Sequence, residues 1–297
     1  MTTPRVSIGM PVRNGEALVS QAIRSHLEQT LEDFELVICD NASTDATEEV
    51  CREFVAADPR VSYHRQPENV GAARNYNDTL ARASGRYFKW AAHDDVVEPT
   101  YLARCVERLE DRPDVVLACS RIARIDAEGK ALGVEEYGLR VESPRPSVRF
   151  RDIVAKNHSC FQIFGVMRTD ILRRTPGHGA HVGADRNLLA EMALYGPFAV
   201  VDEVLFKRRV HEGAYSGSHM SLQEQAKWHD PHGNHASGDD IRRAEYRAAL
   251  ARTALSDSER RACERVLRVD YPLSKLAYQL RRRAARVKRR LKAARAT

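Results

Sequence analysis

The sequence has little of what marks several specialised protein classes. Its 297 residues include only 16 Gly, 12 Pro and 2 Trp, and 43% are hydrophobic against 30% charged. This composition excludes collagen-like, low-complexity and largely disordered chains. No apolar run approaches the roughly 20 residues that a membrane-spanning helix needs, and no charged leader precedes the apolar segment that begins at Val6. We therefore expect a globular protein that is neither secreted nor embedded in a membrane.

Paired-cysteine and phosphate-loop motifs are missing as well. The 6 cysteines stand apart, and none forms a Cys-x-x-Cys pair. Several fall in apolar segments, so we expect reduced, mostly buried thiols in a cytoplasmic protein. The chain has no Gly-x-x-x-x-Gly-Lys-Ser/Thr loop and no Gly-x-Gly-x-x-Gly after its first apolar segment. These absences argue against a P-loop NTPase and a dinucleotide oxidoreductase.

Acidic residues are absent from the end of the chain. The formal net charge is +6, but residues 281–297 hold nine Arg and Lys and no acid, which leaves −3 for residues 1–280. The basic character therefore belongs to a tail and does not favour a protein-wide nucleic-acid surface. Apolar residues recur at helical spacing from Leu273 to Leu291. They predict a basic helix that lies weakly on an anionic membrane, at its inner face; a solvated terminal helix or nonspecific polyanion binding is the alternative.

What the sequence does contain is an alternation of strand-like and helix-like segments. We expect strands at 6–12, 34–40, 61–65, 87–91 and 115–125, with helices at 15–29, 72–83 and 99–109. This order is typical of an α/β protein with a mostly parallel central sheet flanked by helices. Ligands of such sheets bind beyond the carboxyl ends of the strands. Three polar clusters stand there, at residues 13–14, 40–41 and 93–95.

The pattern changes after residue 125. We expect a hairpin turn at 126–129, helices at 148–155 and 185–195, and strands at 160–168 and 198–206, which complete the cleft of the first half. From Leu222 onward helical periodicity dominates. The sequence thus predicts one domain over 1–221, divided at residue 125, and a helical C-terminal extension over 222–297 that ends in the basic tail 281–297.

Two adjacent carboxylates, Asp94 and Asp95, follow the strand predicted at 87–91. Hard cations such as Mg²⁺ take oxygen ligands, commonly one or two carboxylates together with substrate phosphates. Because neighbouring acids repel each other, the pair favours a bound cation. The alternative is a solvated turn that caps the helix beginning near Pro99.

Four segments together resemble the family 2 glycosyltransferases: residues 9–15, 34–45, 69–75 and 93–95. They occur in the family's order, and the resemblance covers about residues 5–215. It implies the Rossmann-like GT-A fold and inverting transfer of a sugar from a nucleotide-diphosphate sugar, with UDP or dTDP as the nucleotide and Mg²⁺ or Mn²⁺ as cofactor. On this basis 1–125 would be the nucleotide-binding half and 126–221 the acceptor half. Processive members carry Gln-x-x-Arg-Trp and membrane spans, which this sequence lacks, so we expect a non-processive enzyme.

The resemblance also implies a role for each residue that matches a family motif. Around the nucleotide these are Pro11 and Arg13 beside the base, Asp40 as acceptor for the ring N–H of uracil or thymine, and Asn69, Gly71 and Arg74 as the pocket wall. A carboxylate only accepts hydrogen bonds and so suits that N–H, and the Arg74 guanidinium suits a diphosphate. Asp94 would lie near ribose and metal, Asp95 would bind the metal directly, and His211 would be a further metal ligand.

The general base is expected at Asp185. The family usually places the base as the Asp of a Glu-Asp pair at a helix start, and here residues 183–189 match that stretch without the Glu. Inversion needs a carboxylate that takes the proton of the acceptor hydroxyl. Asp185 as a helix N-cap is the alternative. A catalytically inactive nucleotide-sugar-binding protein and a GT-A-like nucleotidyltransferase also remain open as functions.

The other histidines give His178-x-x-His181 and His229-x-x-His232-x-x-His235. Both groups stand in segments with Gly or Pro and match no standard zinc spacing. We expect them on the surface. For the acceptor of the sugar, the resemblance implies a hydroxyl of a glycan, of a lipid-linked compound or of a small molecule.

Overall fold

The computed structural model describes residues 3–135, 138–211, 213–214, 220–233, 238–277 and 280. Of the basic helix predicted from Leu273 to Leu291, the structure describes residues 273–277 and 280, which are helical. The basic tail 281–297 lies outside the described ranges.

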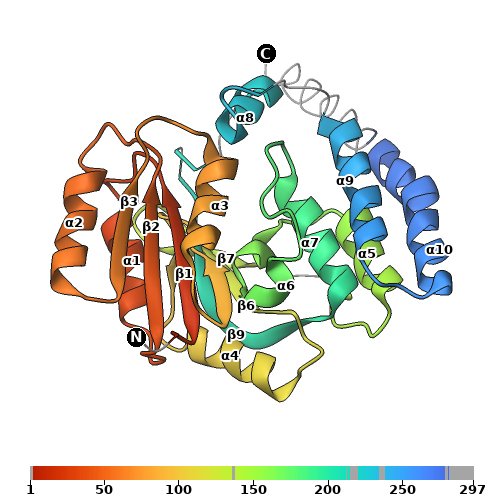
Figure 1. Cartoon of the computed structure of the whole chain (residues 1–297), viewed down its shortest axis with the longest axis horizontal. Coiled ribbons are helices and arrows are strands. Elements are labelled where there is room, and N and C mark those ends of the chain that lie inside the picture. Colours follow the sequence, from red (N-terminus) through yellow and green to blue (C-terminus); the bar gives the residue numbers. More distant parts are fainter. Residues whose placement is uncertain are drawn as a thin grey trace, which may run out of the picture.

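The first half forms parallel strands connected by helices, as predicted (Figure 1). Its four parallel strands lie in the order β3-β2-β1-β4. The strands are β1 (Val6–Val12), β2 (Phe34–Asp40), β3 (Val61–Arg65) and β4 (Tyr87–Trp90), and the helices are α1 (Val19–Leu27), α2 (Thr47–Ala57), α3 (Ala72–Arg82) and α4 (Tyr101–Asp111). The first three predicted strands have the predicted bounds. β1 and β2 are mostly apolar and buried on both faces, whereas β3 at the edge of the sheet is only partly buried.

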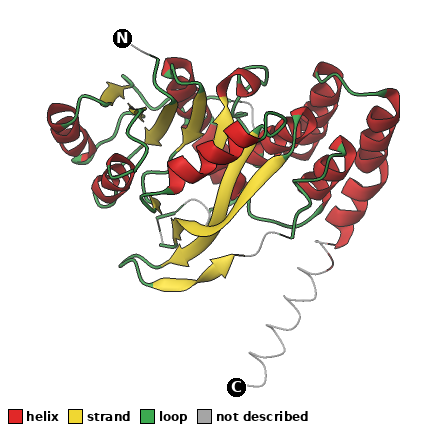
Figure 2. Ribbon diagram, turned by 90° about the horizontal axis from the view of Figure 1, so that it is seen from below, coloured by secondary structure: helices red, strands yellow, loops and turns green. Residues whose placement is uncertain are grey.

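Further strands from both halves extend this sheet on the β4 side. The order continues β4-β8-β6-β9-β5, with β8 antiparallel to both neighbours, β9 parallel to β6 and β5 antiparallel to β9. These strands are β5 (Val96–Val97), β6 (Leu117–Ile125), β8 (Val166–Arg168) and β9 (Phe198–Arg209). The predicted hairpin joins β6 to β7 (Ala131–Glu135), and these long strands extend beyond the helices in Figure 2.

One predicted strand is wrong over most of its length. Residues expected as a strand at 160–168 contain the 3-10 helix η1 (Phe161–Phe164), and only β8 is extended. The neighbouring side chains of Gln162 and Ile163 are both buried, whereas successive residues of a strand point to opposite faces. This short segment therefore buries two adjacent side chains, which a tight helical turn permits and a strand with one exposed face does not.

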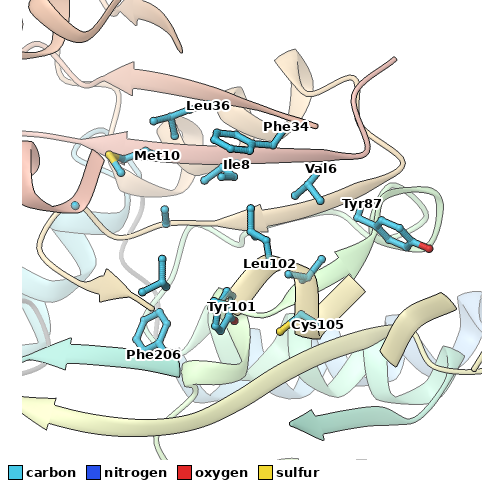
Figure 3. Packing of buried hydrophobic residues seen from close by; sticks show 14 of the residues in the cluster. Val6, Ile8, Met10, Phe34, Leu36, Tyr87, Tyr101, Leu102, Cys105 and Phe206 are labelled. Carbon is cyan, nitrogen blue, oxygen red and sulfur yellow. The ribbon is translucent and has the colours of Figure 1, made fainter. Parts of the chain in front are cut away.

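Helices cover the sheet on both faces and form two cores. One core contains β1 side chains with residues of α1, α2 and α4, including Ile8, Leu36 and Leu102 (Figure 3). The other contains Phe88, Trp90 and residues of α5, α7, α9 and α10. In β4, Tyr87 lies in the first core while Phe88 and Trp90 lie in the second. The strand that leads to Asp94 is therefore buried along its whole length.

The remaining helices follow β7 in the chain. Their bounds are α5 (Pro146–Ala155), α6 (Thr169–Leu172), α7 (Ala184–Tyr195), α8 (Leu222–His229), α9 (Gly238–Arg252), α10 (Asp257–Arg265) and a π-helical turn η3 (Val266–Asp270). Arg252 of α9 pairs with Glu191 of α7 at 2.7 Å, and Tyr246 packs edge-on against Phe150 of α5. Among helices in the described ranges, none combines the length and apolar character that crossing a bilayer requires.

Candidate active site

A cavity of about 790 Å³ opens at the carboxyl ends of the parallel strands. Both halves of the sheet and the C-terminal region line it, so the predicted convergence of polar clusters is found in one place. Its polar and aromatic lining includes Arg13, Asn41, Asn69, Tyr76, Asp94, Asp95, His178, Asp185, Arg208, Arg209, His211, Trp228 and His229.

The two acids after β4 meet the end of β9. Asp95 Oδ1 accepts a hydrogen bond from the backbone N–H of Arg209 at 2.8 Å, and His211 Nε2 lies 2.9 Å from Asp94 Oδ2. The Arg209 guanidinium donates to the backbone carbonyl of Asp94 at 3.0 Å. Antiparallel pairing of Val96 with Lys207 fixes this arrangement. Residues 117 positions apart are thereby held together by the backbone of the sheet.

The charge balance at this position favours a cation. Burial raises the pKa of Asp95, and the adjacent charge of Asp94 raises it further, against the opposing effects of the Arg209 N–H and Arg208. In the described part of the chain, no group of three or more His, Cys, Asp or Glu is arranged to hold a metal ion. Two carboxylates and an imidazole nevertheless suit Mg²⁺ or Mn²⁺ when phosphate oxygens supply the remaining ligands. The residues present therefore fit a cation that arrives with a nucleotide diphosphate.

Asparagines form one wall of the cavity. Asn41 Nδ2 donates to Asn69 Oδ1 at 2.8 Å, and Asn41 Oδ1 accepts from the N–H of Val70 at 2.8 Å. Arg13 donates to the backbone carbonyl of Asn41 at 3.3 Å. Ala42 follows with φ of 55°, a conformation that costs a non-glycine residue free energy and is common at functional sites. Pro11, Arg13 and Asn69 line the cavity as predicted.

Asp40, in contrast, is absent from the cavity lining. Its side chain is fully buried and accepts hydrogen bonds from the Ser43 N–H and hydroxyl, the Tyr63 hydroxyl and Arg65. Successive residues at a strand end point to opposite sides, so Asp40 faces β3 while Asn41 faces the cavity. This arrangement does not support the predicted contact of Asp40 with a nucleobase, and the next residue, Asn41, lines the cavity.

Two other predicted pocket residues lie behind the wall. Arg74 is exposed and does not line the cavity, because the buried face of α3 carries Ala72, Ala73 and Asn75 instead. Its predicted contact with a diphosphate is not supported. Gly71 is not in the lining either, but a Cβ there would lie 2.5 Å from the carbonyl oxygen of His229. With φ of 83°, this glycine permits α8 to approach the start of α3.

Asp185 lies in the cavity at the start of α7. The N-cap of that helix is Gly183, with φ of 87°, so Asp185 is not the cap. Asp185 Oδ1 instead accepts a hydrogen bond from His178 Nε2 at 2.7 Å. Burial raises the pKa of Asp185, but the hydrogen bond and positive charge of His178, with smaller effects of His229 and His181, outweigh it and lower the pKa overall. The carboxylate is thus kept ionised and available as a proton acceptor.

Sequence reasoning missed several residues of the site. His178, His181 and His229 were expected on the surface, yet each is at most 5% exposed, and two of them line the cavity. Arg208, three positions before the predicted metal ligand His211, also lines the cavity. The seven-residue spacing of His178 and Asp185 was the one available signal for that pair. Trp228 comes from α8, which no motif marked.

Comparison with known proteins now identifies the family. The sequence model described as "Glycosyl transferase family 2" matches residues 7–175. The chain belongs to glycosyltransferase family 2. This confirms the predicted family and enzyme class.

Two relatives illustrate the extent of the similarity. This glycosyltransferase is 31% identical to an uncharacterized glycosyltransferase of Rickettsia typhi, over 75% of this chain and 69% of the relative. It is 27% identical to the chondroitin synthase of Escherichia coli over 75% of this chain, but spans only 31% of that protein. The chain therefore corresponds to about a third of that longer relative.

Solved structures support the predicted fold class. S. aureus TarS 1-349 in complex with UDP-GlcNAc has a TM-score of 0.62 and 15% identity, covering 92% of this chain and 73% of that one. The mannosyltransferase PcManGT from Pyrobaculum calidifontis, in complex with GDP-Man and Mn²⁺, has a TM-score of 0.56 and 19% identity, covering 92% and 72%. At these identities the comparison shows the fold, an α/β GT-A architecture with a mostly parallel sheet.

Proposed function

We propose that this glycosyltransferase moves a single sugar from a nucleotide-diphosphate sugar to an acceptor hydroxyl, with inversion at the anomeric carbon. The observation that carries the proposal is that one cavity contains the acidic pair Asp94-Asp95 and the carboxylate of Asp185. The first group comes from residues 1–125, the proposed nucleotide-binding half, and the second from the proposed acceptor half, 126–221. Donor and acceptor would meet between them.

Each group has a task in such a transfer. Arg13, Asn41 and Asn69 would hold the nucleoside, and Arg208 supplies positive charge near Asp95. Asp94, Asp95 and His211 would hold Mg²⁺ or Mn²⁺, which neutralises charge on the diphosphate when bound. Asp185, ionised by its His178 contact, would take the proton from the acceptor hydroxyl. The new bond then forms on the face of the anomeric carbon opposite the leaving diphosphate, which inverts that centre.

The nucleotide is a separate part of the proposal. Asp40 no longer supports a preference for uracil or thymine, since its oxygens are already occupied. Asn41 carries both donor and acceptor groups and accommodates more than one base edge. UDP or dTDP stays our first choice because the TarS structure is a complex with UDP-GlcNAc. GDP sugars belong in the test because the mannosyltransferase structure contains GDP-Man.

A thermal-shift panel with UDP, dTDP, GDP and CMP sugars, with and without Mn²⁺, tests donor binding. Donor hydrolysis, with water as acceptor, then tests turnover, and NMR of the released sugar reports its initial anomeric configuration. We expect Asp185→Asn to lower kcat by roughly 10² or more while donor affinity stays unchanged, because general-base contributions have that size. Binding without turnover in the wild type would instead indicate a nucleotide-sugar-binding protein, and retention of configuration would contradict inversion.

We also propose peripheral binding of the tail 281–297 to anionic membranes, on the sequence pattern alone. Nine basic residues without an acid each contribute about 1 kcal/mol near an anionic surface. Full-length protein should pellet with anionic but not with neutral vesicles, and less so at high salt. A chain that ends at Leu280 should stay in the supernatant. Equal recovery of both chains there would contradict the proposal.

A further inference from the structure

The loop before α7 carries two histidines, and each pairs with a carboxylate of a helix at nearly the same distance. His178 pairs with Asp185 of α7, and His181 pairs with Glu245 of α9. His178 Nε2 lies 2.7 Å from Asp185 Oδ1, and His181 Nε2 lies 2.7 Å from Glu245 Oε2. The two histidines are 4% and 5% exposed, and both carboxylate side chains are 39% exposed. Only the first pair lines the cavity. The pairs therefore share their structural setting and differ in their access to substrate.

We propose that His178 is the positioning residue of the general base: its Nε2–H holds Oδ1 of Asp185, so that Oδ2 is directed to the acceptor hydroxyl. This inference rests on the proposed function, in which Asp185 takes a proton. The direction of the hydrogen bond follows from chemistry, because an ionised carboxylate only accepts and the imidazole must donate. A charge-assisted bond of this kind is stronger than a neutral one.

Two neighbouring rings pack against the imidazole ring of His178. Tyr76 of α3 packs against it with ring centroids 4.8 Å apart, and His229 of α8 stacks on it at 5.6 Å with an interplanar angle of 21°. The ring is thus fixed by an element from the nucleotide side and an element from the C-terminal region. A ring confined in this way keeps its Nε2 aimed at one oxygen of Asp185.

The backbone of His178 is clamped as well. Its N–H donates to Asn77 Oδ1 at 2.8 Å, and Asn77 Nδ2 donates to its carbonyl oxygen at 2.9 Å. The preceding Gly177 has φ of 76°, and a Cβ there would lie 2.3 Å from Asn77 Oδ1. The loop is therefore built around a two-way contact with α3. Such support is what a precisely oriented catalytic group requires.

Electrostatics supports the same role. The titratable groups around the pair are Tyr76 from α3, Cys160 next to η1, His181 from the same loop and His229 from α8. Burial acts to raise the pKa of Asp185, and the contact with His178 is the largest effect that lowers it. Loss of His178 should leave the burial effect less opposed. The carboxylate would then be protonated at a higher pH and lost as a base.

The step balances without further reagents. The acceptor O–H bond breaks, its oxygen forms the bond to the anomeric carbon, and the carbon–oxygen bond to the diphosphate breaks with its electron pair on the leaving group. The proton goes to Oδ2 of Asp185. His178 keeps its own proton throughout and touches neither sugar.

The matched pair supplies the control. We compare His178→Phe, which keeps a ring packed against Tyr76 and His229 but removes the donor, with His178→Gln, whose amide restores a donor. His181→Phe makes the same change in the pair outside the cavity. Donor hydrolysis over a range of pH gives kcat, KM and the acid limb of kcat/KM, while thermal unfolding and donor titration report folding and binding.

We expect His178→Phe to lower kcat about tenfold or more, part of the roughly 10² to 10⁴ that a general base contributes. Its acid limb should move to higher pH, with donor affinity unchanged. His178→Gln should recover most of kcat. His181→Phe should lower stability without changing kcat, and it should move the acid limb less than His178→Phe does, because His181 lowers the pKa of Asp185 less than His178 does. Wild-type kcat and acid limb in His178→Phe, or the same loss in His181→Phe, would overturn the inference.

Asp185→Asn separates this inference from the function on which it rests. If that variant loses turnover while His178→Phe keeps it, the role of His178 is refuted and the proposed base stands. If Asp185→Asn turns over like the wild type, or the wild type shows no turnover, the proposed function is refuted and the role of His178 with it.

Discussion

Lys89 offers a measurable test of how the strand leading to the acidic pair is buried. The residue lies in β4 and is 0% exposed. Its Nζ donates to the carbonyl oxygen of Trp90 at 3.0 Å and lies 3.3 Å from His26 Nε2. His26 Nδ1 lies 2.8 Å from the Ala22 carbonyl oxygen, which can only accept, so Nδ1 carries the hydrogen and Nε2 accepts from Lys89. The rings of Tyr101 and Phe206 lie nearby.

Burial lowers the pKa of Lys89 from 10.5 to about 7, against opposing effects of Cys105 and Asp95. The folded state therefore releases a proton that the unfolded chain retains between these two pH values. Stability rises with pH through this window, because the unfolded state binds more protons there. From pH 7 to pH 8.5 the linkage amounts to about 1.5 kcal/mol, since one pKa unit corresponds to about 1.4 kcal/mol.

Lys89→Met removes this titration while filling a similar volume. We expect the free energy of unfolding of the wild type to rise by about 1.5 kcal/mol relative to that variant between pH 7 and pH 8.5. Urea unfolding at half-unit steps of pH measures both. Lys130→Met, at an exposed position, is the control for loss of a lysine charge. Parallel curves for the wild type and Lys89→Met would refute the argument.

Three further changes test the site. Asp95→Asn keeps the acceptor for the Arg209 N–H but removes a negative charge. The Mn²⁺-dependent affinity for UDP, measured by calorimetry, should therefore fall at least about tenfold, because even changes in the outer shell of a metal site cost that much. An unchanged affinity would contradict the metal assignment. Asp40→Asn should lower the free energy of unfolding by about 1.5–3 kcal/mol, the range for hydrogen bonds to a charged group, without changing the order of nucleotide preference; selective loss of UDP binding at full stability would contradict this. Trp228→Ala should raise the KM of a saccharide acceptor about tenfold and leave donor affinity unchanged. The reason is that the exposed ring lines the cavity and that aromatic contacts are worth about 0.5–1.5 kcal/mol beyond area burial. Equal KM values for the variant and the wild type would exclude Trp228 from the acceptor site.

The sequence was sufficient for the order of the elements and for the position of the cleft. Strands such as Val6–Val12 and Phe34–Asp40 are continuous apolar runs, and hydrophobic periodicity is a local property that a single sequence displays. The placement of polar clusters at the strand ends then follows from the geometry of parallel sheets. Asp94 and Asp95 could be predicted to line the cavity for this reason. Asp185, at the start of α7, was predicted from the resemblance to the family instead.

The side to which a residue points was harder to predict. Asp40 and Asn41 are neighbours at one strand end, and only the structure shows that the carboxylate is used by Ser43, Tyr63 and Arg65. Whether the Arg74 side chain faces the cavity depends on the rotation of α3 about its axis. The mixed composition of that helix does not determine this rotation. The burial of His178 depends on α8, which contributes His229 from a distant part of the chain. Contacts of this kind arise from tertiary packing and have no local signature.

The path of β9 determines where this enzyme can be divided. The family match ends at residue 175, whereas Asp185, Arg208 and Trp228 follow it and line the cavity. Joining two relatives at residue 175 would therefore transfer these three residues from one enzyme to the other. However, β9 pairs with β6 from Leu117 to Ile125 and with β5 directly after Asp95. A chimaera with the acceptor specificity of a relative must therefore take β6 together with β9 from that relative. Its junction belongs before residue 117, in the segment after α4. The new β9 must also match the resident β5, with which it pairs.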